Sequence, residues 1–143
     1  MIRKFILFLI SFSAWSAECI SGNCTNGFGT MVYEDGQSYV GDFQNFKQHG
    51  QGTQTWPTGE TYSGSWKDGN HHGQGTYKWA DGDIYSGNWE NGKKNGLGSY
   101  TWANGMKFIG HWKNNKRDGL GSEYLPNGIV ITGVWKDGIF KSN

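Results

Sequence analysis

The side chains best suited to bind a metal ion are four histidines and two cysteines, and their spacing does not favour a metal site. His49 and His72 occupy equivalent positions of a 23-residue repeat. In a sheet with two strands per repeat, such positions lie roughly 9–10 Å apart, whereas each ligand of a zinc ion lies about 2 Å from it. His71 adjoins His72 and would point to the opposite side of a strand, and His111 belongs to another repeat position. We therefore expect no metal and solvent-exposed loop histidines.

The residues that could catalyse a reaction also lack suitable partners. Asp81 and Asp83 form a carboxylate pair, but they flank Gly82 in a pattern that a turn already explains. The serines occupy repeat positions and have no specific histidine partner. Gly-x-Gly recurs, but no helix follows it to present its N-terminus to a phosphate. The sequence predicts a non-catalytic chain without a cofactor.

Cys19 and Cys24 are the only cysteines. Four residues separate them, which excludes a redox Cys-x-x-Cys motif. In an oxidising compartment two such neighbours are expected to form a structural disulfide. Closing this six-residue loop stabilises the fold by roughly 2 kcal/mol in the chain-entropy model.

The first 16 residues have the pattern of a cleaved signal peptide. Arg3 and Lys4 precede an apolar run over residues 5–12, and Ala14-Trp15-Ser16 resembles a cleavage site. An uncleaved anchor is the alternative; Glu18, directly before Cys19, argues against a lipoprotein. We expect an exported chain, periplasmic or extracellular, with a disulfide-bonded segment over residues 17–25 and a repeat array over residues 26–143. Its halves carry net charges of −3 (residues 17–80) and +2 (residues 81–143), too weak a polarity to indicate nucleic-acid binding.

Four complete 23-residue units, 39–61, 62–84, 85–107 and 108–130, lie between two half units. In each unit, aromatic residues and glycines alternate with polar residues, as on one face of a β-strand. The structural aromatics fall into three columns, namely Tyr39, Tyr62, Tyr85 and Phe108; Phe43, Trp66, Trp89, Trp112 and Trp135; and Trp56, Trp79 and Trp102.

One connection of each unit predicts a specific turn. Pro57 and Pro126 share one slot and a glycine follows two residues later, which favours a type I turn closed by a left-handed glycine. A three-residue loop of this type pairs Tyr77 with Tyr85 and places both aromatic arms on one face. The second connection, around residues 67–72, is longer, and its register is left open.

Together these patterns predict an all-β fold, an elongated single-layer antiparallel sheet of consecutive β-hairpins. Aromatic rings packed over glycines form its core, because aliphatic residues are few. Trp135 lies in the last half unit, so Trp135→Ala should cost less stability than Trp89→Ala in the middle unit, because a neighbour is missing.

These columns resemble the MORN (membrane occupation and recognition nexus) repeat, whose pattern is Tyr-x-Gly-x-Trp, then Gly-x-Gly, then an aromatic before a glycine turn. The resemblance covers residues 26–140, with perfect copies around Trp66 and Trp89. Departures at Phe46 and Asn115, where a loop glycine is usual, predict looser or capping units. The resemblance implies a module for protein interaction or oligomerisation, with a disputed role in binding acidic phospholipids.

Two kinds of partner follow from this sequence. A protein, or a second copy of the chain, would bind to the open sheet edges or the aromatic face. Acidic lipid or glycan would instead bind the basic loops or the aromatic face, and the candidate anionic-surface contacts are Lys93, Lys94, Lys113, Lys116 and Arg117. The simpler interpretation of these cations is a solvated loop charge.

Overall fold

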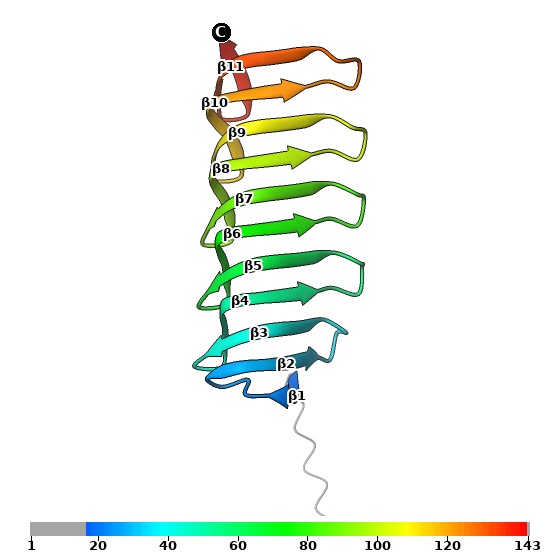
Figure 1. Ribbon diagram of the computed structural model, residues 1–143, viewed down its shortest axis with the longest axis vertical. Coiled ribbons are helices and arrows are strands. Elements are labelled where there is room, and N and C mark those ends of the chain that lie inside the picture. The colour runs from blue at the N-terminus through cyan, green and yellow to red at the C-terminus, as the bar shows by residue number, and fades with distance from the viewer. Residues whose placement is uncertain (1–16, 143) are drawn as a thin grey trace, which may run out of the picture.

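The computed structural model describes residues 17–142, which form twelve β-strands in one antiparallel sheet, paired in chain order (Figure 1). The strands are β1 (Ala17–Gly22), β2 (Gly27–Tyr33), β3 (Ser38–Gln44), β4 (Lys47–Thr55), β5 (Thr61–Lys67), β6 (Asn70–Lys78), β7 (Ile84–Glu90), β8 (Lys93–Thr101), β9 (Lys107–Lys113), β10 (Lys116–Tyr124), β11 (Val130–Lys136) and β12 (Ile139–Ser142). This confirms the predicted all-β, single-layer fold. The described part contains no helix long and apolar enough to cross a membrane. The predicted signal peptide, residues 1–16, lies outside the described residues.

The predicted three-residue turn is confirmed. Tyr77 pairs with Tyr85, and the Trp79 N–H donates to the carbonyl of Asp83 at 2.9 Å. Gly82 closes the loop with φ of +99°, a conformation that favours glycine. These turns lie on the right of the stack in Figure 1.

The second connection, which the sequence left open, is a two-residue turn. Asp68 and Gly69 both have positive φ, 48° and 81°, as in a type I′ hairpin. Phe46 and Asn115 also take positive φ, 62° and 69°, so the units that lack the usual glycine keep the same turn. On the β6 side the pairing jumps from His71 to Gly75, which leaves three residues opposite the single residue Ser65. The bulge bends the hairpin tip back over the aromatic face, on the left of Figure 1.

The core is the row of first-arm rings that these bent tips cover. Tyr39, Tyr62, Tyr85 and Phe108 have 0% exposure. Tyr62 lies flat against the backbone of Gly75, where an added Cβ would come 2.2 Å from its hydroxyl oxygen. The Tyr62 ring contacts Trp66 of its own unit and Trp89 of the next unit edge to face, at 5.0 and 5.5 Å. The core is therefore continuous from unit to unit.

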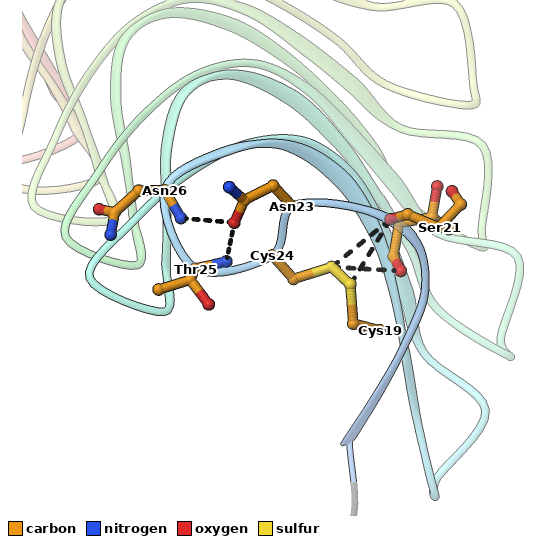
Figure 2. The surroundings of a disulfide bond; sticks show 7 residues. Cys19, Ser21, Asn23, Cys24, Thr25 and Asn26 are labelled. Atoms are coloured by element: carbon orange, nitrogen blue, oxygen red, sulfur yellow. Dashed lines mark hydrogen bonds between the residues drawn. A yellow bond between two sulfur atoms is a disulfide. The ribbon is translucent and has the colours of Figure 1, made fainter.

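The two ends of this core are closed by different groups. At the N-terminal end Cys19 and Cys24 form a disulfide, and the Asn23 side chain accepts hydrogen bonds from the backbone N–H groups of Thr25 and Asn26 in the turn that follows (Figure 2). Cys24 is buried, and its sulfur lies over Gly29 as the ring of Tyr39 lies over Gly52.

At the C-terminal end, the expectation that Trp135 lacks a neighbour is wrong. Its exposure is 1%, because the ring of Phe140 packs against it at 5.0 Å from the following strand. An aromatic residue of β12 thus takes the place of the missing unit.

Candidate binding face

The second arms carry a strip of rings that remains only half-buried. This aromatic strip consists of Trp56, Tyr77, Trp79, Tyr100 and Trp102, from three successive units. Ring centroids along it are 5.4, 4.5, 5.3 and 4.6 Å apart, with tilts of 35° to 48° between neighbouring rings. The rings pack against the core on one side and contact solvent on the other, so they form a continuous apolar surface.

The indole nitrogens distinguish this strip from the core. Trp66, Trp89 and Trp112 each donate to a glycine carbonyl of the preceding unit, at 3.1 to 3.2 Å. Within residues 17–142, no hydrogen bond is made by the indole N–H of Trp56, Trp79 or Trp102. The strip therefore presents hydrogen-bond donors beside its apolar rings.

Each bent tip places one further side chain over the rings of its unit. This tip column comprises Gln48, His71, Lys94, Arg117 and Phe140. His71 stacks on Tyr62 with centroids 3.7 Å apart and planes 10° apart. Burial lowers the pKa of the His71 imidazole to about 4. The expectation of solvated loop histidines is therefore wrong for His71.

Lys94 points inward as well. Its Nζ lies 4.5 Å from the ring centre of Tyr100, 4.8 Å from that of Trp112 and 5.3 Å from that of Trp79. Such cation–π contacts are favourable, but burial disfavours the charged amine. Burial lowers the pKa of Lys94 to about 8, against the opposing effect of the Asp83 carboxylate.

The five candidate anionic-surface residues therefore divide into two groups. Arg117 lies over the rings of Phe108 and Trp135 and forms an ion pair with Glu123. Lys94 and Arg117 belong to the inner face and are not the exposed loop charges that the sequence suggested. The exposed cations are Lys93, Lys113 and Lys116 at the tips.

The carboxylate pair of Asp81 and Asp83 has a structural role. Asp83 accepts hydrogen bonds from the Tyr100 hydroxyl at 2.5 Å and from the backbone N–H of Ala103 at 2.8 Å. Asp81 accepts the N–H of Asp83 within its own turn. Among residues 17–142 there is no group of three or more His, Cys, Asp or Glu placed to hold a metal ion.

The outer face of the sheet differs from this inner face. Phe28, Leu97, Ile109 and Leu120 are exposed there, between 43% and 64%. Polar pairs such as Thr76 and Ser86, with hydroxyls 3.0 Å apart, lie between Phe28 near the N-terminal end and the three aliphatic residues toward the C-terminal end. The outer face therefore has no continuous aromatic surface.

Fold and face together define a class, an open single-layer β-repeat sheet with a continuous half-buried aromatic strip on its inner face. The MORN repeat family model matches residues 25–38, 39–61, 62–84, 85–107 and 108–130, and the chain belongs to this family. MORN repeats are non-catalytic modules that mediate protein or membrane binding.

Comparison with curated proteins finds no match. Among solved structures, the chain is similar to the TCP domain of SAS-4 (dCPAP) from Drosophila melanogaster, solved in complex with a proline-rich motif of Ana2 (dSTIL). Sequence identity is 15% and the TM-score is 0.48, over 77% of this chain. The chain spans 61% of the length of that domain.

Proposed function

We propose that this chain is a protein-interaction module that binds an extended, proline-rich peptide along the aromatic strip. The observation that carries the proposal is the continuous row of half-buried rings from Trp56 to Trp102. Among the described residues, the indole N–H groups of Trp56, Trp79 and Trp102 have no acceptor. An apolar surface of this kind on a repeat protein is typical of an interaction site.

The pitch of the array supports the polyproline conformation in particular. Each unit contributes two strands, so equivalent rings of neighbouring units are about 9.4–9.8 Å apart. A polyproline II helix rises about 9.3 Å per three-residue turn. A peptide in this conformation, lying along the array, brings the same side of each turn to the same ring of each unit. An α-helix, with a pitch of about 5.4 Å, does not keep this register.

The chemistry of the strip suits the same ligand. A polyproline II helix has no internal hydrogen bonds, so its carbonyls accept bonds from donors such as the indole N–H of Trp79. Proline rings pack on aromatic rings, and the helix is already ordered before binding, which lowers the entropic cost.

Titration with a proline decamer tests this proposal through tryptophan fluorescence or calorimetry. Trp79 is the central ring of the strip, and we expect Trp79→Ala to weaken binding at least tenfold. Leu120→Ala is the matched control, because Leu120 is 64% exposed on the outer face. This variant should bind the decamer with wild-type affinity. Equal affinity of the wild type and Trp79→Ala, or no binding by the wild type, would contradict the proposal.

A second candidate function is binding to an anionic lipid or glycan surface. The observation that favours it is the placement of Lys93, Lys113 and Lys116, exposed at the tips of two successive units. Binding to vesicles containing an anionic phospholipid should then fall steeply with salt and with replacement of these lysines by Ser. Vesicle binding that is unaffected by salt and by the lysine replacements would rule out this function.

We further propose that the module works outside the cytoplasm. The charged and apolar pattern of residues 1–16 and the disulfide between Cys19 and Cys24 support export. N-terminal sequencing of the protein from its native envelope or medium should find residue 17 first. A first residue of Met1 would refute cleavage.

A further inference from the structure

A hollow lies beside the aromatic strip at its C-terminal end. It measures about 280 Å³ and is lined mainly by Lys94, Tyr100, Trp102, Trp112, Lys116 and Arg117. Two of its walls, Tyr100 and Trp102, belong to the strip itself, so a peptide on the strip passes directly over the hollow.

The cations of this hollow are unequally paired. Arg117 forms an ion pair with Glu123, and its second nitrogen donates to the carbonyl of Gly138 at 3.0 Å. Lys94 has no hydrogen-bond acceptor or ion-pair partner within residues 17–142, and its contacts are ring faces. The Asp83 carboxylate raises the pKa of Lys94, but it accepts its hydrogen bonds from Tyr100 and Ala103. The ammonium group of Lys94 therefore has no acceptor from the described residues.

The equivalent positions of earlier units show that this charge is local. Gln48 fills the same place two units earlier and donates to the Tyr33 hydroxyl and the Gln54 side chain. His71 fills it one unit earlier as a neutral ring stacked on Tyr62. Among the tip-column residues, all of which are described, only Lys94 is a cation that points inward without an acceptor or ion-pair partner.

We propose that this hollow is an anion subsite, in which Lys94, with Lys116 at the rim, binds the carboxylate of an acidic residue in the bound peptide. The proposal rests on the proposed function and names a feature of the ligand beyond its proline content. A charge-assisted bond to a half-buried ammonium is stronger than one to a hydrated lysine, because the surrounding rings exclude water. The subsite would also set the register and direction of the peptide along the repeats.

A set of proline decamers tests the subsite, each carrying one Glu or, in the matched peptide, one Gln at the same position. At one position we expect the Glu decamer to bind wild-type protein about tenfold more tightly than its Gln partner. Lys94→Met keeps an unbranched stem among the rings but removes the charge, so the preference should disappear. Lys93→Met, at the exposed neighbouring position, should retain it.

A second measurement needs no peptide. NMR titration of the Lys94 ammonium, with and without malonate as a carboxylate probe, should show a higher pKa in the presence of malonate, because the anion binds the protonated amine preferentially. A rise of one unit corresponds to tenfold tighter binding to the charged form. The Lys93 amine should titrate unchanged by comparison.

The outcomes separate the two proposals. If the all-proline decamer binds but neither the Glu preference nor the malonate effect occurs, the subsite is refuted and the proposed function stands. If malonate acts on Lys94 but no decamer binds, the proposed function fails and the anion subsite remains. If binding to anionic vesicles is lost in Lys94→Met but not in Lys93→Met, the occupant is a lipid phosphate, and the peptide carboxylate is overturned.

Discussion

Two sets of aromatic rings share the inner face of this sheet, and they differ in what surrounds them. In the middle unit, Tyr85 and Trp89 of the first arm are 0% and 6% exposed, under a bent hairpin tip. Trp79 and Tyr100 of the adjoining second arms are half-buried beyond that tip. The same residue types thus form a core in one column and a surface in the next.

The polar atoms follow the same division. The Tyr85 hydroxyl donates to the Asn88 carbonyl at 2.9 Å, and the Trp89 indole to the Gly75 carbonyl at 3.1 Å. The indole of Trp79 has no such partner among the described residues. We therefore expect substitutions to separate stability, which the buried column provides, from the proposed binding by the half-buried column.

The largest effect is expected from Trp89→Ala. This buried indole contacts rings of its own and the preceding unit, so we expect its loss to reduce the free energy of unfolding by about 3–5 kcal/mol. Trp135→Ala should cost a similar amount, because Phe140 completes its packing. Urea unfolding measures both, and a much smaller loss at Trp135 would show that the C-terminal end is loosely packed.

A pH effect of about 2 kcal/mol is expected from His71. The folded pKa is about 4, below the value of roughly 6.5 in the unfolded chain, because the ring is buried. As pH falls from about 6.5 to 4, the His71 imidazole is protonated in the unfolded chain but stays neutral in the folded chain. The free energy of unfolding therefore decreases through this window. Solvent contact of the half-buried ring keeps the effect below the full linkage value.

His71→Gln removes this titration and introduces the residue found at the equivalent Gln48. Thermal unfolding at pH 7 and at pH 4.5 should show a smaller acid-induced loss in this variant than in the wild type. Equal losses in both proteins would mean that the His71 ring titrates normally and is not buried.

Removal of the disulfide is expected to cost about 2 kcal/mol. The bond closes the N-terminal end of the buried columns, where Cys24 lies over Gly29. The Cys19→Ser, Cys24→Ser protein should unfold at lower urea concentration while keeping its affinity for the proline decamer. A loss of affinity of the same size as that of Trp79→Ala would show that this end belongs to the binding surface.

The smallest effect on stability is expected at the strip. Trp79→Ala should reduce the free energy of unfolding by about 1–2 kcal/mol, because the ring is only half-buried. Urea unfolding compared with Trp89→Ala provides the measurement. A loss as large as that at Trp89 would place Trp79 in the core and end the distinction between the two columns.

The fold was predictable from the sequence because its strongest signals are local and repeated. The shared slot of Pro57 and Pro126 indicated the three-residue turn, and the turn then determined the register of Tyr77 and Tyr85. The two-residue turn had a signal in Asp68-Gly69, a pair favoured in type I′ hairpins.

The bulge that follows this turn had no comparable signal. Its bend decides which tip residues face the rings, so the sequence placed His71, Lys94 and Arg117 in solvent. Their inward positions depend on contacts with neighbouring units, such as that of Lys94 with Trp79, which the periodicity of one strand does not reveal. The alignment of the strip residues on one face was therefore predictable, but their half-buried position and the inward tip column beside them were not.

The indole N–H resonances of the protein test the separation of the two columns most directly. On addition of the proline decamer, the signals of Trp56, Trp79 and Trp102 should shift, because their N–H groups are free to donate to the peptide. Those of Trp66, Trp89 and Trp112 should stay in place, since they remain bonded to glycine carbonyls in the core. Shifts confined to the second group, or the same shifts in both, would contradict a binding strip distinct from the core.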